Sequence, residues 1–316
     1  MRLAFILDHL DSIKTYKDSS YAMMQEAALR GHKLYTLQQG DIVWKGGRTT
    51  GFARRLELIS GTSERPGWYR VDEPEEFPLK DFDAVLMRKD PPFDMEYVYS
   101  TYLLELAENE GARVINSARA VRDHNEKLSI AKFPQYTPPT LVTRQETLIR
   151  DFLSEYGDII LKPLDGMGGA SVFRVHRADH NVGVIIETLT HYGTRTIMAQ
   201  RYIPEIAQGD KRILLIAGEV VPYTLTRIPK PGETRGNLNV GAVGITQTLS
   251  PCEREIADAI GPALNDNGLM LVGLDVIGGY LTEINVTSPT GMREITDQTG
   301  FNVAGMMIDA LERMTG

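Results

Sequence analysis

The sequence predicts an α/β fold in two parts, and two observations support this prediction. Over the first 115 residues, short apolar runs alternate with helical patterns, as they do where parallel strands are joined by crossover helices. Farther along, apolar runs come in pairs joined by turns that contain glycine, as in antiparallel hairpins. The first pattern predicts an N-terminal, Rossmann-like domain with a parallel sheet, over residues 1–123. The second predicts an α+β unit over residues 124–316.

The N-terminal domain is expected to begin with a strand and then to alternate helices with strands. Gly31 and Gly111 are natural helix ends, because each follows a helical pattern directly. Residues 40–80 are richer in glycine, proline and charge, so we expect irregular or hairpin-like structure there. Ligands bind at the carboxyl ends of parallel strands, and Arg88 lies at such an end. The expected strands are 2–8, 32–37, 83–88 and 113–115, and the expected helices run from a cap at 17–20 to residue 30 and over 95–110.

The second unit is expected to open with a short helix at 125–128. Residues 201–204 follow a strand and are expected to form a hinge-like crossing segment. From Pro229 to Gly244 the chain has no periodicity, and a loop this long in a compact protein is usually functional or disordered. The expected strands are 140–143, 159–161, 172–176, 196–200, 210–216, 219–225, 270–277 and 280–286, and the expected helices are 144–156, 180–192, 252–267 and 302–313.

The composition is that of an ordinary globular protein, with 42% hydrophobic and 24% charged residues in a chain of 316. No apolar run is long enough to span a bilayer, so we expect no membrane partner. The net charge of −8 disfavours nucleic-acid binding. Cys252 is the single cysteine, which excludes an internal disulfide and is typical of the reducing cytoplasm.

A glycine-rich turn between two apolar runs is the first candidate site. Lys162 ends the first run, and Gly166, Gly168 and Gly169 follow it closely. Successive backbone N–H groups in such a turn can form an anion-binding nest, and the lysine adds a positive charge. The pattern favours a polyphosphate ligand, although glycine-rich hairpin turns are also common without one. It matches neither the P-loop nor the Rossmann glycine motif, so phosphate would be held by a flap between strands.

Three oxygen-bearing side chains near the C-terminus form the second candidate site. Glu283 and Asn285 are two residues apart on a strand, so they share a face. Asp275, on the preceding strand, is also an odd-numbered polar residue between apolar ones. Such oxygen ligands suit Mg²⁺ or Mn²⁺, although a merely solvated strand face would carry similar residues. A two-residue turn at Gly278–Gly279 would turn Asp275 away from Glu283. A shared site therefore requires an odd-length turn or a β-bulge.

Several motifs together resemble those of bacterial glutathione synthetase, in the same order and over nearly the whole chain. They are Met87–Asp94, Leu161–Ser171, Gly209–Arg212, Arg227–Pro229, Gly232–Asn237 and Leu281–Pro289. The resemblance implies an ATP-grasp ligase, in which ATP lies between two subdomains behind the N-terminal domain. Here these subdomains would be a central, lid-like one at about 124–203 and a C-terminal one at about 204–316.

The resemblance also implies a role for individual residues. ATP would be held by Lys127, Lys162, Gly166, Gly168, Gly169, Gln200, Tyr202, Ile203 and Asp210. Asp275, Glu283 and Asn285 would hold Mg²⁺ or Mn²⁺. Arg212 and Arg227 would face the reacting groups, and Ser20, Arg88, Arg235, Asn237 and Ser288 would bind the peptide substrate.

The implied reaction joins γ-glutamylcysteine to glycine through an acyl phosphate, which needs positioning and charge neutralisation more than a covalent nucleophile. The resemblance further implies a homo-oligomer, such as a tetramer. Two alternatives stay open. One is another ATP-grasp carboxylate–amine ligase, of the D-Ala–D-Ala type or a glutamate-adding type. The other is a nucleotide-binding module without catalysis.

Overall fold

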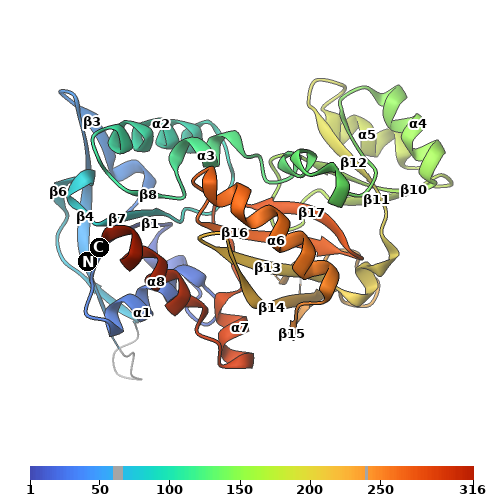
Figure 1. The fold of residues 1–316 in the computed structure, drawn as a ribbon. Coiled ribbons are helices and arrows are strands. Elements are labelled where there is room, and N and C mark those ends of the chain that lie inside the picture. Colours follow the sequence, from blue (N-terminus) through green and yellow to red (C-terminus); the bar gives the residue numbers. More distant parts are fainter. Residues whose placement is uncertain (60–66, 239–240) are drawn as a thin grey trace.

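The computed structural model describes residues 1–59, 67–238 and 241–316, which form three sheets with helices packed around them (Figure 1). The N-terminal sheet has a parallel centre, as expected. Helices α2 and α3 cover one face of it, and α1 and α8 cover the other (Figure 1). Because both faces are covered, its central strand is buried along almost its whole length. The elements of the domain are β1 (Arg2–Ile6), α1 (Ser19–Leu29), β2 (Lys33–Leu37), β7 (Ala84–Met87), α2 (Met95–Asn109), β8 (Val114–Ile115) and α3 (Ala118–Asp123).

The hairpin-like structure expected within residues 40–80 is present as an antiparallel extension of this sheet. Its longest strand, β4 (Arg48–Leu58), pairs with β2 and with three shorter strands. These are β3 (Ile42–Lys45), β5 (Tyr69–Val71) and β6 (Glu75–Pro78). Residues 60–66, which also fall in that expectation, lie outside the described residues.

A four-stranded antiparallel sheet with two helices forms the central subdomain. The glycine-rich turn joins two antiparallel neighbours in it, which confirms the expected strand–turn–strand unit. Most of the buried apolar side chains of the subdomain form a cluster of their own within residues 149–199, whereas Met198 belongs to the core shared with the rest of the molecule. The elements are β9 (Thr140–Thr143), α4 (Glu146–Tyr156), β10 (Asp158–Pro163), β11 (Phe173–His176), α5 (Val182–Thr190) and β12 (Ile197–Arg201).

A five-stranded antiparallel sheet forms the C-terminal part, and α8 reaches back from it to pack on α1. Two elements of this part, β15 and α7, were not predicted, and neither was α3 in the N-terminal domain. β15 is an edge strand without a buried residue, and α7 buries only Met292 and Ile295, so neither carries a strong hydrophobic pattern. The elements are β13 (Asp210–Ile216), β14 (Glu219–Ile228), β15 (Val243–Thr248), α6 (Pro251–Asp266), β16 (Leu271–Ile277), β17 (Tyr280–Asn285), α7 (Met292–Thr299) and α8 (Val303–Thr315).

The N-terminal domain and the C-terminal sheet share their apolar cores. Val121 belongs to the same buried cluster as Leu269, and Ile115 to the same cluster as Leu214. Asn116 adds a polar link, because its side chain makes three hydrogen bonds of 2.8 Å to the backbone of Leu271 and Val286. These contacts hold the first and last thirds of the chain together.

Candidate active site

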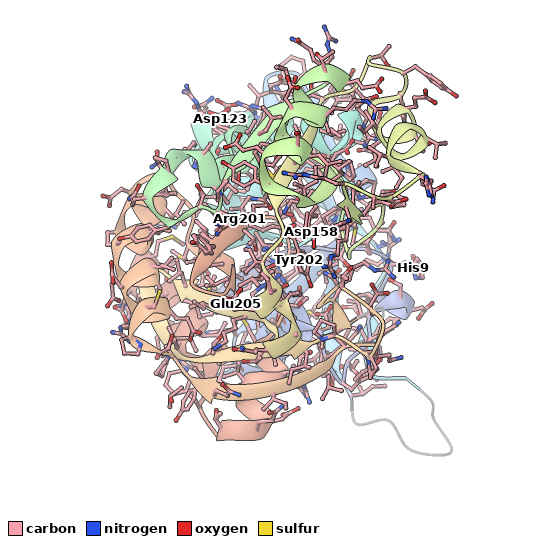
Figure 2. All side chains as sticks on the ribbon, turned by 90° about the vertical axis from the view of Figure 1, so that its right-hand side faces the viewer. His9, Asp123, Asp158, Arg201, Tyr202 and Glu205 are labelled. Atoms are coloured by element: carbon pink, nitrogen blue, oxygen red, sulfur yellow. The ribbon has the colours of Figure 1, made fainter. Side chains whose placement is uncertain are left out.

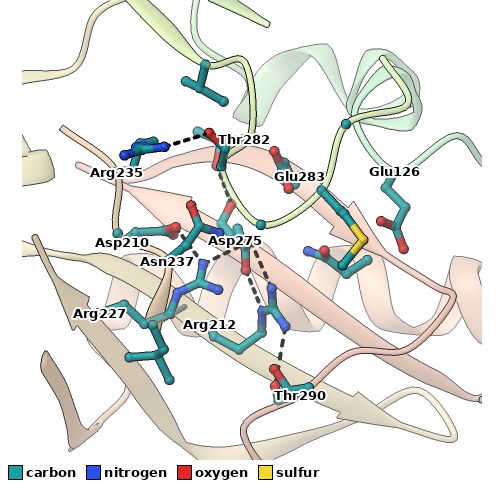
Figure 3. Close-up of a pocket in the computed structure, with 18 of the residues that line it drawn as sticks. Glu126, Asp210, Arg212, Arg227, Arg235, Asn237, Asp275, Thr282, Glu283 and Thr290 are labelled. Atoms are coloured by element: carbon teal, nitrogen blue, oxygen red, sulfur yellow. Dashed lines mark hydrogen bonds and ion pairs between the residues drawn. The ribbon is translucent and has the colours of Figure 1, made fainter. Parts of the chain in front are cut away.

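A cavity of about 400 Å³ lies where the N-terminal domain, the central subdomain and the C-terminal sheet meet (Figure 3). All but two of the residues that the sequence proposes for the site line this cavity. The exceptions are Arg88 and Ser20, which lie behind its wall. The Nε of Arg88 donates to the Ser20 hydroxyl at 3.0 Å, and its Nη2 donates to the carbonyl of Pro289 at 2.9 Å. Arg88 thus affects the cavity indirectly, by supporting the loop that carries Ser288 and Pro289.

The glycine-rich turn forms one wall of the cavity. Gly168 and Gly169 have positive φ angles of 60° and 80°, a region that L-residues seldom occupy. A Cβ atom on Gly169 would lie 2.6 Å from the Asn237 side-chain oxygen, so this position is closed to other residues by contact as well. The turn can therefore present its backbone N–H groups closely to a ligand.

Two buried lysines lie beside this turn and share one carboxylate. The Nζ atoms of Lys127 and Lys162 are each 3.6 Å from Glu283 Oε1, and Lys127 also donates to the carbonyl of Gly166. Burial lowers the pKa of Lys162, while Glu283 acts to raise it. Two cations that share one counter-charge leave a positive region suited to the phosphates of a nucleotide.

The expected β-bulge is present in the hairpin of β16 and β17. Ile277 pairs with Tyr280 across the two-residue turn, yet Asp275 pairs with Glu283, so Thr282 is the extra residue. The Thr282 hydroxyl donates to the Asp275 carbonyl at 3.1 Å. The bulge shifts the pairing of the two strands by one residue. Asp275 therefore lies next to Glu283, which a two-residue turn alone would not allow.

The carboxylate of Asp275 is held by two arginines (Figure 3). Arg212 donates to its two oxygens at 2.5 and 3.0 Å, and Arg227 Nη2 lies 2.9 Å from Oδ2. Burial alone would raise the pKa of Asp275, but the two guanidinium groups outweigh it and hold this pKa well below its usual range. Asp275 is therefore an anion that positions both arginines.

Asp210 forms an ion pair with Arg227, one of the two arginines that hold Asp275. Its Oδ2 accepts from Arg227 Nη2 at 2.5 Å, while its Oδ1 is buried without a partner among the described residues. Burial raises the pKa of Asp210 to about 7, even though Arg227 acts to lower it. An oxygen without a partner in the cavity wall can accept a hydrogen bond from a ligand hydroxyl.

The residues proposed as metal ligands meet the requirements of a small, hard cation only in part. Among the described residues, no three His, Cys, Asp or Glu side chains form a ready-made metal cluster. Glu283 faces the cavity, and Asn285 donates from its amide nitrogen to the Gly273 carbonyl at 3.1 Å, which directs its oxygen away from that bond. One carboxylate and one amide oxygen suit Mg²⁺, which takes few protein ligands and fills the rest with water and phosphate.

The segment after β12 joins the central subdomain to the C-terminal sheet (Figure 2). Tyr202 donates from its backbone to the Asp158 carbonyl at 3.0 Å, and its ring is covered by Arg174 at 3.7 Å. The cation of Arg201 lies 5.3 Å from the centre of the Tyr280 ring. The cavity wall here combines Gln200 and Tyr202 with the apolar side chains Ile160, Ile203, Ile206 and Ile277, a slot suited to a flat base.

The first half of the loop from Pro229 to Gly244 reaches the glycine-rich turn. Arg235 Nη1 donates to the Gly169 carbonyl at 3.3 Å and is paired with Glu233 at 2.6 Å. The hydrogen bond from Arg235 lowers the pKa of Glu233 to about 2. Residues 239–240 of this loop lie outside the described residues.

Glu126 and Glu294 are two of the four acidic residues of the cavity wall that were not identified from the sequence, and Asp18 and Asp90 are the others. Glu126 accepts from the backbone of Val286 and Thr287 at 2.9 and 3.1 Å and from the Thr287 hydroxyl at 2.8 Å, so it fixes the chain that leaves β17. Glu294 lies in the first turn of α7 and also lines the cavity. Neither residue stands in a local pattern that indicates a ligand, because both enter the site by tertiary packing.

Two family models match the chain, the N-terminal domain of prokaryotic glutathione synthetase over residues 1–122 and its ATP-grasp domain over residues 126–300. The glutathione synthetase of Nitrosomonas europaea is 68% identical over 313 residues, which cover 99% of this chain and 98% of that protein. The glutathione synthetase of Neisseria meningitidis serogroup A is 54% identical over 312 residues, which cover 98% of each chain.

Solved structures agree on the fold. D-cycloserine synthetase DcsG superposes with a TM-score of 0.69 at 15% identity, over 99% of this chain and all of that one. The ATP-grasp ligase PsnB complexed with a minimal precursor gives 0.66 at 19% identity, over 99% of each chain. The predicted ATP-grasp fold is thereby confirmed, and the chain belongs to the prokaryotic glutathione synthetase family of ATP-dependent ligases.

Proposed function

We propose that the protein ligates γ-L-glutamyl-L-cysteine with glycine and converts ATP to ADP and phosphate. The observation that carries the proposal is one cavity with two lysines and a glycine-rich turn on one side and a pair of arginines on the other. The lysines and the glycine-rich turn suit a polyphosphate. The arginines suit the substrate carboxylate and the phosphoryl group that is transferred to it. The substrates themselves are proposed from the names of the relatives.

In this proposal the nucleotide base lies in the slot beside Gln200, Tyr202 and Ile203, and the unpartnered oxygen of Asp210 accepts from a ribose hydroxyl. Lys127, Lys162 and the backbone of Gly166, Gly168 and Gly169 hold the phosphates. Glu283 and Asn285, together with the anionic Asp275 beside them, would hold Mg²⁺ or Mn²⁺. When bound, such a cation neutralises charge on the phosphate oxygens.

The carboxylate of γ-glutamylcysteine attacks the γ-phosphate of ATP, and an acyl phosphate forms as ADP leaves. Glycine then attacks the carbonyl through its amine, and phosphate leaves as the peptide bond forms. Arg212 and Arg227 orient the carboxylate and stabilise the charge of the phosphoryl group. Asp275 contributes by holding both guanidinium groups in place before the substrates arrive, so that little rearrangement is needed during the reaction.

The test is phosphate release from ATP by the purified protein, measured with each substrate alone and with both. We expect release that requires γ-glutamylcysteine and glycine together, with glutathione formed in equal amount. Release supported equally well by D-alanine or glutamate as acceptor would favour another ATP-grasp ligase. Binding of ATP without any release would favour a non-catalytic nucleotide-binding module.

Arg88→Ala is expected to raise the KM for γ-glutamylcysteine far more than the KM for ATP. Arg88 supports the loop that carries Ser288, and its Nη1 is buried without a partner among the described residues. Its loss would disturb the peptide side of the cavity and leave the nucleotide side intact. Steady-state kinetics with each substrate varied in turn measure the two constants, and a change confined to ATP would contradict this role.

The loop from Pro229 to Gly244 is expected to act as a lid, because an acyl phosphate hydrolyses in open water. Trypsin should cleave the ligand-free protein at Arg235, whereas Lys230 is protected by Pro231. ATP, Mg²⁺ and peptide together should slow this cleavage, since bound substrates would stabilise the contacts that Arg235 and Asn237 already make with the glycine-rich turn. Deletion of the loop should preserve ATP binding but uncouple ATP hydrolysis from peptide formation.

Cleavage at the exposed Arg119, on α3 and away from the cavity, provides the internal control for this experiment. Its rate should not depend on the ligands. Equal rates at Arg235 with and without ligands would show that the loop does not close over the substrates.

The small-molecule substrates of the family need no macromolecular partner. In the part of the chain that the structure describes, every helix is too short or too polar to cross a membrane. We also propose, from the family resemblance, that the protein is a cytoplasmic homo-oligomer, such as a tetramer. Sedimentation of the purified protein would test its oligomeric state.

A further inference from the structure

Most acidic side chains in the cavity wall already have a donor. Asp275 and Asp210 are bound by arginines, Glu283 by two lysines, and Glu126 by backbone N–H groups. The remaining ones outside α7 also have donors, since Asp18 accepts from the Tyr21 backbone and Asp90 from the Ser288 side chain. Asp210 and Glu294 each have one buried oxygen without a partner among the described residues, and the reaction described above assigns a part to Asp210 but none to Glu294.

One carboxylate oxygen of Glu294, Oε2, is buried and has no hydrogen-bond partner among the residues that the structure describes. The carboxylate does bond to the backbone of its own residue, which fixes its position. Burial raises its pKa, whereas Lys17 and Arg212 act to lower it and Asp297 acts to raise it. A buried carboxylate oxygen without a donor is costly in the empty protein, and a ligand that supplies the donor removes this cost.

The position of Glu294 is close to the reacting groups. It lies in the first turn of α7, and the residues just before this helix contact Arg212. Arg212 Nη1 donates to the Thr290 carbonyl at 3.3 Å, and a Cβ atom on Gly291 would lie 3.5 Å from Arg212 Cγ. The arginines can bind anionic groups of the substrates, and they cannot bind a cationic one. A substrate ammonium in this part of the cavity therefore needs a carboxylate.

We propose that Glu294 binds the ammonium group of an amino-acid substrate. The inference rests on the proposed function, whose two substrates each carry such a group. One is the α-ammonium of the γ-glutamyl residue, and the other is the ammonium of glycine. Either would donate to Oε2 in a charge-assisted hydrogen bond. Glu294 would then discriminate against substrates of similar shape that lack the charge.

The test compares Glu294→Gln with Asp297→Asn, which makes the same change of charge one turn farther along α7 at an exposed position. The KM values for γ-glutamylcysteine, glycine and ATP are measured for each variant. A fourth series replaces γ-glutamylcysteine by N-glutarylcysteine, which lacks the α-ammonium. We expect Glu294→Gln to raise one amino-acid KM by about tenfold or more, as loss of a charge-assisted hydrogen bond would.

The pattern of KM changes distinguishes the two sources of the ammonium. If the group belongs to the γ-glutamyl residue, the KM for γ-glutamylcysteine rises and that for N-glutarylcysteine does not change. If it belongs to glycine, only the KM for glycine rises. Glu294→Asp, which keeps the charge, should retain more affinity than Glu294→Gln in either case.

Changes below about twofold in both amino-acid KM values would overturn the inference, since a charge-assisted bond is worth more than that. An equal effect of Asp297→Asn, or a greater loss with Glu294→Asp than with Glu294→Gln, would overturn it as well. Unchanged ATP affinity in the variants shows that the fold is intact. Failure of the wild-type protein to form glutathione would refute the proposed function instead, so the two failures are distinguishable.

Discussion

Glu283→Gln is expected to keep the fold and to lower ligase activity by about 100-fold or more, because a neutral amide balances neither a divalent cation nor two lysines. Glu283 Oε1 lies 3.6 Å from both Lys127 and Lys162, and its side chain is 25% exposed toward the cavity. The fold should tolerate the change, since the amide occupies the same space. Turnover is measured across a titration of Mg²⁺, where the deficit should be largest at limiting metal.

The matched control is Glu219→Gln, the same change at an exposed position at the start of β14 in the same sheet. Its activity should equal that of the wild-type protein. Wild-type turnover by Glu283→Gln at limiting Mg²⁺ would show that this carboxylate holds no metal.

Asp275→Asn is expected to lower the free energy of unfolding by about 3–5 kcal/mol, the usual cost of removing one partner from a buried charge cluster. Asp275 is 4% exposed, and its carboxylate is the counter-charge for Arg212 and shares Arg227 with Asp210. An amide would accept a hydrogen bond but would leave two buried cations with less compensation. Denaturant unfolding at pH 7 measures the change.

Asp258→Asn is the control, because Asp258 pairs with Arg254 at 2.9 Å with both side chains 52% exposed. Removal of such an exposed pair should cost less than about 1 kcal/mol. The pKa of Asp275 is lower in the folded protein than in the unfolded chain, so its stabilisation is fully present above the unfolded pKa of about 4. The contribution of Asp275 to the difference between wild type and Asp275→Asn should therefore shrink as the pH falls below about 4. A loss no larger than that of the control would contradict the buried cluster.

The sequence predicted those parts of the site that depend on local pattern. The glycine-rich turn was identified because its glycines follow an apolar run that ends in Lys162, and the structure shows that run as β10. Asp275 and Glu283 could share a face across a two-residue turn only if one strand contained an extra residue. The sequence therefore required a bulge, and the bulge lies at Thr282. Both inferences use the fixed geometry of neighbouring residues on strands.

The parts that were missed depend on contacts between distant segments. Nothing near Glu126 indicates that it binds the chain after β17, which is 160 residues away in sequence. The strand-end position of Arg88 was read correctly, yet it does not reveal that Ser20 and Pro289 cover the side chain. The paired strands also predicted the position of Asp275 without its two arginines, because Arg227 comes from β14, a strand that does not adjoin β16.

The separate apolar cluster of the central subdomain has a consequence for the energetics of motion. Apart from Met198, its buried apolar side chains lie in a cluster of their own, whereas the N-terminal domain and the C-terminal sheet share theirs. Rotation of the central subdomain about the segment after β12 would leave its own cluster intact and would disturb only the apolar contacts that Met198, Val142 and Leu164 make with the larger core. The cleft should thus open at a lower cost in free energy than global unfolding, while the shared cores predict that the other two parts unfold together as one cooperative unit.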